Sequence, residues 1–298
     1  MRKTLTIWNP GMDEGGIFPG RLAHLPAGQI ELLDALDAGS RPLYERDAAA
    51  AGEAHAVLVT GVPRSGTTLM TQQVARWFDV SYVSNMAAPF WRTPSVGLRF
   101  AAMVAGDGAV PPSLASQRGR TVEPTNVHEF GYFWSWIFGM PTMREAEARH
   151  PARWGELSRA IAAMTTVGER PVVLKSFHVA LNLREAVRTL PSSIIVVMDR
   201  DVRSCADSLH RAKASGGLDE LGLVTRDQHH DASELDQILA LQGRIDRAAR
   251  LMNSQEAQRL LVVEHDDLVH DPARVMVNLA EECDRRMPWR LQPRTLAP

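Results

Sequence analysis

A short apolar run that leads through a glycine-rich loop into a helical pattern constrains this chain most. Residues 56–60 read AVLVT, which lacks polar alternation and is typical of a strand buried on both faces. The loop Gly61–Thr68 follows, and the next residues, LMTQQVARWF, carry apolar side chains at helical spacing. Such a loop aims backbone N–H groups and the positive end of the helix dipole at one point. The segment therefore predicts an anion site.

Three more apolar runs repeat this order of strand and helix. They are residues 171–175, 194–199 and 260–264, and helical patterns follow near residues 180–190, near residues 202–212 and from Pro272. Strands that alternate with helices favour parallel pairing, with helices on both faces of the sheet. We predict an α/β fold in which a three-layer, P-loop-type, mostly parallel sheet is flanked by helices.

The composition excludes several classes of protein. The formal net charge is only −2, which argues against a broad surface for nucleic acid or membranes. Cys205 and Cys283 lack zinc-ligand spacing and are too few for a disulfide framework, so we expect buried thiols in a reducing compartment. Asn9 and Pro10 interrupt the N-terminal apolar stretch before it reaches signal-peptide or membrane-span length. We expect a cytoplasmic protein without a transmembrane segment, a nucleic-acid partner or a metal site.

The loop departs from the pattern that binds nucleoside triphosphates. The spacing of Gly61 and Gly66 matches the start of a Walker A sequence, but Thr67 stands where that pattern needs a lysine. The cation is Arg64, inside the loop, and hydroxyl side chains follow it. A compact anionic group suits this loop better than a triphosphate chelated to magnesium.

The segment PRSGTT, residues 63–68, resembles the 5′-phosphosulfate loop of the sulfotransferase family, P-[KR]-S-G-T-[TS]. Its arginine form is closer to the carbohydrate and bacterial branches than to the small-phenol enzymes. The resemblance implies that the donor is 3′-phosphoadenosine-5′-phosphosulfate (PAPS). The residues that would hold its 5′ side are Arg64, Ser65, Gly66, Thr67 and Thr68.

A second segment resembles the 3′-phosphate motif of that family, R-D-P-R-D-x-x-x-S. The strand at 194–199 leads into Arg200, and Ser208 lies eight residues later, about two helical turns along. Val202 replaces the usual proline, and Ser204 replaces the second aspartate. The resemblance implies that Arg200 and Ser208 hold the ribose 3′-phosphate, a group that ATP does not have. The R-K-G loop with which small-phenol enzymes also hold this phosphate is missing, so either Arg285 or Arg286 replaces it or nothing does.

The length and the apolar content favour a single domain over residues 1–298, of which the resemblance covers residues 56 to roughly 280 and leaves out residues 1–54. We expect a mostly irregular N-terminal arm at 1–54 with an amphipathic helix near Gln29–Leu36, a phosphosulfate-loop unit at 55–85, an acceptor-side insertion at 86–170, a 3′-phosphate half at 171–280 and a tail at 281–298. The insertion contains an aromatic cluster at residues 130–138, which either lines an acceptor pocket or packs in the core.

The segment from Val172 to His178 resembles the K-[ST]-x segment of the family and places Lys175 at a strand end. Lys175, with Arg64, is expected to stabilise charge on the leaving group. The small-molecule branch has its catalytic histidine two residues after the lysine, where this chain has Phe177; His178 is adjacent. In carbohydrate branches the base is often a glutamate in the insertion. We favour Glu129 there, with His128 and His178 behind it, and Glu123 as a further alternative.

The sequence therefore predicts a sulfotransferase. It would move the sulfuryl group of PAPS in line to the hydroxyl or amine of a small-molecule, sugar or lipid-linked acceptor, with a general base, release of PAP and no metal. Two alternatives stay open at this point: a P-loop kinase or NTPase that uses ATP and magnesium, and a catalytically silent PAP-binding protein.

Overall fold

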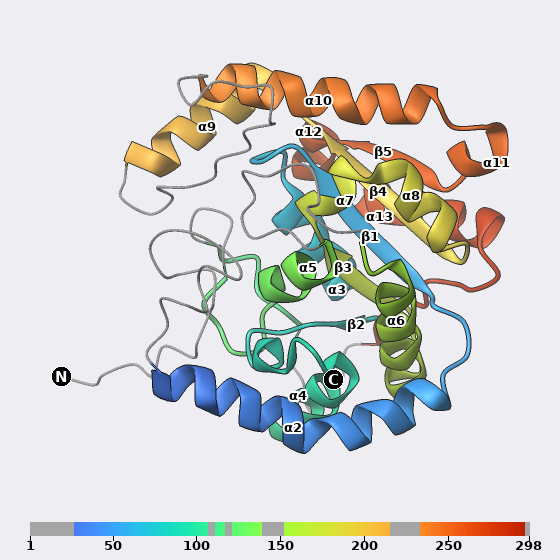
Figure 1. Ribbon diagram of the computed structural model, residues 1–298. Coiled ribbons are helices and arrows are strands. Elements are labelled where there is room, and N and C mark those ends of the chain that lie inside the picture. Colours follow the sequence, from blue (N-terminus) through green and yellow to red (C-terminus); the bar gives the residue numbers. More distant parts are fainter. Residues whose placement is uncertain (1–26, 107–110, 117–120, 139–151, 215–232, 296–298) are drawn as a thin grey trace.

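The computed structural model describes residues 27–106, 111–116, 121–138, 152–214 and 233–295 (Figure 1). Its centre is a parallel sheet of five strands in the order β2-β3-β1-β4-β5. The strands are β1 (Ala56–Gly61), β2 (Ser81–Tyr82), β3 (Val172–Lys175), β4 (Ser193–Asp199) and β5 (Leu260–Glu264). The predicted parallel sheet is confirmed, and the strand that precedes the glycine loop is its middle strand.

Helices cover both faces of the sheet, because alternate side chains of the central strands enter two separate cores. Leu58 and Leu174 belong to one core, whereas Val57 and Val173 belong to the other. The first core is closed by α5 (Gly131–Phe138), α6 (Trp154–Gly168), α7 (Phe177–Leu181), α8 (Leu183–Thr189), α9 (Val202–Ala214) and α10 (Glu234–Arg250). The second is closed by α3 (Thr67–Trp77), α12 (His265–His270) and α13 (Pro272–Arg286). The predicted three-layer α/β arrangement is therefore confirmed.

The N-terminal arm differs from the expectation. The helix expected near Gln29–Leu36 is present, but it is part of one continuous helix, α2 (Ala27–Ala49), so the expectation of irregular structure is wrong for residues 37–49. Gly39 and Pro42 lie inside the helix, and both are local signals for a helix end. Residues 1–26, with their predicted turns, lie outside the described residues.

Tertiary contacts explain why α2 continues past these signals. The Ser40 hydroxyl is 2.7 Å from the Thr93 hydroxyl, next to α4 (Pro94–Ala105). The buried Asp47 carboxylate accepts hydrogen bonds from Ser95 and Arg99. These contacts stabilise the helix beyond what local propensity provides.

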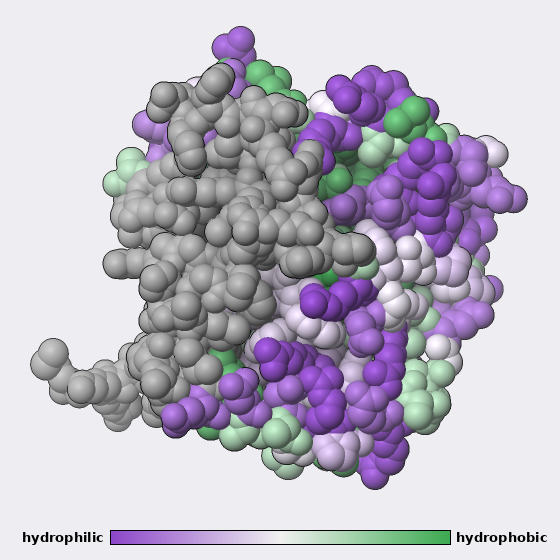
Figure 2. Space-filling model, in the orientation of Figure 1, coloured by the Kyte–Doolittle hydropathy of each residue, from purple (hydrophilic) through white to green (hydrophobic). Residues whose placement is uncertain are grey.

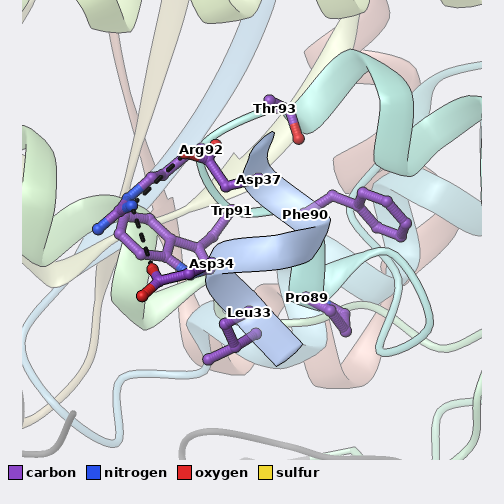
Figure 3. Close-up of a pocket in the computed structure, with 8 residues that line it drawn as sticks. All are labelled: Leu33, Asp34, Asp37, Pro89, Phe90, Trp91, Arg92 and Thr93. Carbon is purple, nitrogen blue, oxygen red and sulfur yellow. Dashed lines mark hydrogen bonds and ion pairs between the residues drawn. The ribbon is translucent and has the colours of Figure 1, made fainter. Parts of the chain in front are cut away.

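A small pocket marks the contact between the start of α2 and the short helix η1 (Ala88–Phe90) (Figure 3). The Arg92 guanidinium lies 4.3 Å from the centre of the Trp91 ring and pairs with Asp34 at 3.8 Å and Asp37 at 3.5 Å. The pocket is lined by Leu33, Asp34, Asp37, Pro89, Phe90, Trp91, Arg92 and Thr93. The charges of Arg92 and of the two aspartates in this pocket are therefore paired with each other.

The aromatic cluster of the insertion packs in the core. Five of its six members are at most 2% exposed: Phe130, Tyr132, Phe133, Trp134 and Phe138. Trp136 is half-buried and has the Arg153 guanidinium 5.5 Å from its ring centre. Of the two alternatives for the cluster, core packing accounts for these five rings.

The surface is mainly polar where helices α8, α10 and α11 (Ser254–Ala257) reach it, with apolar residues in small patches (Figure 2). Within the described ranges, every helix is too short or too polar to cross a bilayer.

Candidate active site

The loop between β1 and α3 has positive φ angles at three positions, a backbone conformation that favours glycine. Gly61 and Gly66 have φ values of 150° and 96°, and Arg64 has φ 69°. A Cβ on Gly61 would lie 2.7 Å from the Ser65 hydroxyl and 2.8 Å from the Met198 carbonyl oxygen. The Ser65 N–H donates to the Val62 carbonyl at 3.2 Å, which closes the turn. In the described structure the Ser65 hydroxyl is buried without a hydrogen-bond partner, although buried polar groups are ordinarily paired.

Lys175 joins three parts of the chain that are distant in sequence. It is the last residue of β3, beside β1, and only 5% of its side chain is exposed. Its Nζ donates to Thr68 Oγ1 at 2.8 Å and forms an ion pair with the Glu129 carboxylate. The centre of the Phe177 ring lies 4.9 Å from Nζ. Thr68 of the glycine loop and Glu129 therefore meet at the ammonium group of Lys175.

Of the two candidate carboxylates, the structure brings Glu129 to this lysine. The Glu129 side chain is 41% exposed, so its carboxylate is reachable from solvent. Glu123 accepts a hydrogen bond from Asn126 Nδ2 at 3.1 Å, a contact within its own turn. Of the two glutamates, Glu129 is therefore the one that pairs with Lys175.

The two candidate histidines are both buried, in different surroundings. Nδ1 of His128 accepts the Phe130 N–H at 2.9 Å, so a neutral His128 carries its proton on Nε2. His178 belongs to α7, and its ring stacks on Phe138 with the ring centres 5.5 Å apart. Burial lowers the pKa of His178 to about 4, and its Nε2 has no hydrogen-bond partner in the described structure. His178 is therefore neutral at pH 7 and packed within the core.

The second motif lies against the loop. Arg200 follows β4, and its guanidinium donates to the Arg64 carbonyl at 2.9 Å. The side chain of Arg64 contacts a third residue, because its Nε donates to the Ser208 hydroxyl on α9 at 3.0 Å. Asp201 orients this helix by accepting the Ser204 N–H at 2.8 Å. The structure thus places Arg64, Arg200 and Ser208 together, as the order of the strands requires.

The electrostatics of this cluster are unusual for arginine. The pKa of Arg64 is lowered, first by burial and next by the positive charge of Arg200, while Glu129 opposes the shift. Both guanidinium groups are half-buried. Within the described ranges, neither has a carboxylate at ion-pair distance, so their charges attract an anion.

His265 is a residue of this site that the sequence did not single out. It follows β5, and a Cβ on Gly66 would lie only 2.7 Å from its Cδ2. The imidazole therefore packs directly on the loop at the start of α3. Its place in the sequence could have indicated this contact. His265 directly follows a predicted parallel strand, and other candidate residues also lie at the carboxyl ends of such strands. Further along the same segment, Asp271 caps the start of α13 by accepting the Arg274 N–H at 3.0 Å.

Arg285 and Arg286 lie away from this cluster. Both pair with Glu282, and Arg286 also donates to the carbonyl groups of Gln258 and Leu260. Leu260 is the first residue of β5, so Arg286 lies at the amino-terminal end of the parallel strands, whereas the loop follows their carboxyl-terminal end. Neither residue takes the place of the missing R-K-G loop.

The described residues contain no group of three His, Cys, Asp or Glu side chains arranged to hold a metal ion. Cys205 and Cys283 are free and buried. Burial raises the pKa of Cys205 to about 11 and that of Cys283 to about 12. Both are therefore protonated thiols at neutral pH.

Comparisons with known proteins show the family and the fold of this chain. Residues 56–289 match the model of the sulfotransferase family. The fold resembles that of sulfotransferase STF1 from Mycobacterium tuberculosis H37Rv, with a TM-score of 0.53 and 14% identity over 84% of this chain and 72% of that one. It also resembles sulfotransferase STF9 from Mycobacterium avium, with a TM-score of 0.53 and 13% identity over 85% of this chain and 68% of that one. No curated protein sequence matches the chain. Because the family match spans most of the sequence, the chain belongs to the sulfotransferase family and is a sulfotransferase.

Proposed function

We propose that this sulfotransferase uses PAPS as its donor and transfers the sulfuryl group to an acceptor hydroxyl or amine, with Lys175 and Glu129 at the reacting centre. The observation that carries the proposal is the position of Lys175, which contacts both Thr68 of the loop and the Glu129 carboxylate. Family membership argues against the kinase and NTPase alternatives. The transfer assay described below tests the catalytically silent alternative.

The cluster of loop and second motif fits a donor with two separate anionic groups. The loop offers the N–H groups at the start of α3 and the unpartnered Ser65 hydroxyl, and its other binding residues would be Gly66, Thr67 and Thr68. The second site offers Arg200 and Ser208 for a 3′-phosphate. When bound, PAPS supplies a sulfuryl group attached to a phosphate leaving group.

Lys175 would stabilise the leaving group. As the bond between sulfur and the bridging oxygen breaks, negative charge develops on that oxygen. A buried ammonium group that Thr68 already orients needs little reorganisation to meet this charge. No step of this mechanism requires a metal ion.

Glu129 would act as the general base. Its carboxylate takes the proton of the acceptor O–H or N–H while the acceptor atom forms its bond to sulfur, and PAP leaves. The ion pair keeps this carboxylate beside Lys175, the cation that would face the leaving group. His128 and His178 remain less favoured, since one is engaged through Nδ1 and the other is packed against Phe138.

The acceptor would be a small-molecule, sugar or lipid-linked compound with a nucleophilic hydroxyl or amine. We place the reaction in the cytoplasm, and the two free, buried thiols support a reducing compartment.

A binding and transfer experiment tests this proposal. PAP should raise the melting temperature of the protein in a concentration-dependent manner, whereas ATP with magnesium should do so only weakly. Transfer of ³⁵S from labelled PAPS should then be screened over alcohols, phenols, sugars and amines, with the Lys175→Met variant as the matched negative control. Stronger protection by ATP with magnesium than by PAP would refute the donor assignment.

A further inference from the structure

The aromatic ring of Phe177 lies against the ammonium group of Lys175. The centre of the ring is 4.9 Å from Lys175 Nζ, within the range of about 6 Å over which the face of an aromatic ring attracts a cation. Only 5% of the Lys175 side chain is exposed, and Phe177 is half-buried. The attraction is strongest in such a site, because water competes little for the cation. The contact therefore helps to hold the ammonium group in place.

The backbone between these two residues is fixed to the central strand of the sheet. The Ser176 N–H donates to the Val59 carbonyl at 3.0 Å, and the Ser176 carbonyl accepts from Thr60 Oγ1 at 2.6 Å. The Ser176 hydroxyl accepts the His178 N–H at 3.2 Å and so caps α7, the helix that Phe177 begins. The position of the ring is therefore set by the sheet and by the start of α7.

The ammonium group loses its charged partner during the proposed reaction. When Glu129 takes the proton of the acceptor, its carboxylate becomes a neutral acid, the acceptor atom bonds to sulfur, and the electron pair of the breaking bond goes to the bridging oxygen of PAP. The ion pair of Glu129 with Lys175 is thus lost while charge develops on that oxygen. Thr68 and Phe177 are uncharged, so their contacts with Lys175 do not depend on this proton.

We propose that Phe177 is a positioning residue, whose ring holds the Lys175 ammonium at the leaving group while Glu129 is neutralised. This inference rests on the proposed roles of Lys175 and Glu129. A ring suits the task because its face attracts the cation without neutralising it, whereas a carboxylate in its place would compete with the anionic oxygen of the leaving group. Phe177 acts through Lys175 and not on the reacting atoms themselves.

Nuclear magnetic resonance of the lysine side chains tests whether the ring holds the ammonium group. The chain contains only Lys3, Lys175 and Lys213, so ¹³C-labelled lysine gives few signals, and Lys175→Met identifies the signal of Lys175. In the wild-type protein its ε-methylene protons should lie upfield of their position in Phe177→Leu, because the face of the ring shields them. The upfield shift should persist in Glu129→Gln, whose neutral amide imitates the protonated glutamate, both without and with PAP. Loss of the shift in Glu129→Gln would mean that the ion pair alone holds the lysine and would overturn the inference.

A second experiment changes the electron density of the ring and keeps its shape. Phe177 is replaced by phenylalanines with increasing numbers of fluorine atoms, which withdraw electrons and weaken the attraction of the ring for a cation. Transfer of ³⁵S from labelled PAPS should slow step by step along this series, while the melting temperature does not fall. Phe177→Leu should lower kcat about 5- to 30-fold, the effect of one desolvated contact of this kind, and Phe177→Tyr should retain more activity than Phe177→Leu. The matched control is the same series at Phe133, whose ring stacks on Phe130 in the core.

The outcomes separate this inference from the proposed function. A flat fluorine series in a protein whose Lys175→Met variant is inactive would overturn the role of Phe177 and leave that of Lys175 intact. An equally steep decline at Phe133 would reveal a general effect of fluorine, which also overturns the inference. A fully active Lys175→Met variant would contradict the proposed function, on which the inference rests. The resonance experiment needs only PAP, so its result stands whichever acceptor the protein uses.

Discussion

Lys175 Nζ donates a hydrogen bond to Thr68 Oγ1 at 2.8 Å, although 107 positions separate the two residues in the sequence. The contact exists because β3 and β1 are parallel neighbours, with Val59 opposite Lys175. The carboxyl ends of neighbouring parallel strands share one edge of the sheet, and there the loop of one meets the last residue of the other. The contact at the proposed reacting centre is therefore a consequence of strand order.

Replacing Lys175 by methionine should reduce kcat about 100- to 1,000-fold, because the bridging oxygen loses its cation while the apolar stem of the side chain is kept. Thr68→Val should reduce kcat less, since the lysine stays but loses its orienting hydroxyl. Thr71→Val is the matched control, because the Thr71 hydroxyl donates only to the Thr67 carbonyl within α3. Transfer from labelled PAPS measures all three variants. Equal losses in the two threonine variants would contradict a specific role of Thr68.

Glu129→Gln should lower kcat about 100- to 10,000-fold with little change in the dissociation constant of PAP, since the amide keeps the size of the side chain but cannot take a proton. Glu123→Gln is the control, because that glutamate contacts Asn126 and not Lys175. Calorimetry with PAP and initial rates with labelled PAPS separate binding from chemistry. Full activity in Glu129→Gln would move the role of base to His128 or His178.

Much of the sheet could be predicted because buried parallel strands are local apolar runs. The run at 260–264 coincides with β5, and the other three predicted strands are within one residue of the observed limits at each end. The strand β2 has only two residues and pairs at the edge with Val172 and Val173, so no local signal marks it. The two motifs converge for a topological reason, since each follows a strand of the same parallel sheet.

Side-chain directions and docking contacts could not be predicted in the same way. The glycine loop indicated an anion site, but the direction of Arg64 depends on Ser208, a residue of another helix. His265 contacts Gly66 only because β5 ends beside the loop. The helix α2 continues through Pro42 because distant residues such as Thr93 and Arg99 bind it. In each case a contact remote in sequence overrides or completes the local pattern.

Gly66→Ala should destabilise the protein by about 1–3 kcal/mol, because an L-residue is strained at φ 96° and its Cβ would lie 2.7 Å from His265 Cδ2. The matched control is Gly155→Ala in the exposed first turn of α6, where nothing lies within 4 Å and alanine should stabilise the helix by about 0.5–1 kcal/mol. Urea denaturation measures both. The double variant Gly66→Ala/His265→Ala should recover part of the loss, since it removes the clash and leaves the backbone strain. No recovery would mean that the imidazole does not press on the loop.

His178 should make the protein less stable as the pH falls from about 6.5 to about 4. Burial lowers its pKa to about 4 in the folded state, whereas an exposed histidine of the unfolded chain has a pKa near 6.5. Between these values the unfolded chain binds a proton that the folded chain does not, so acid favours unfolding. The difference of about 2.5 pH units corresponds to at most about 3 kcal/mol, lost across this interval and constant below it.

The His178→Phe variant isolates this contribution, because phenylalanine keeps a ring that can stack on Phe138 and has no proton to bind. The Nε2 atom of His178 has no hydrogen-bond partner in the described structure, so the substitution breaks no contact of that atom. Urea denaturation of both proteins at intervals from pH 4 to pH 8 should show a free energy of unfolding that falls less steeply with acid in the variant. The two curves should run parallel above pH 7, where the histidine is neutral in both states. Curves that stay parallel down to pH 4 would mean that His178 has the same pKa in the folded and the unfolded protein. The buried position of its ring, stacked on Phe138, would then be contradicted.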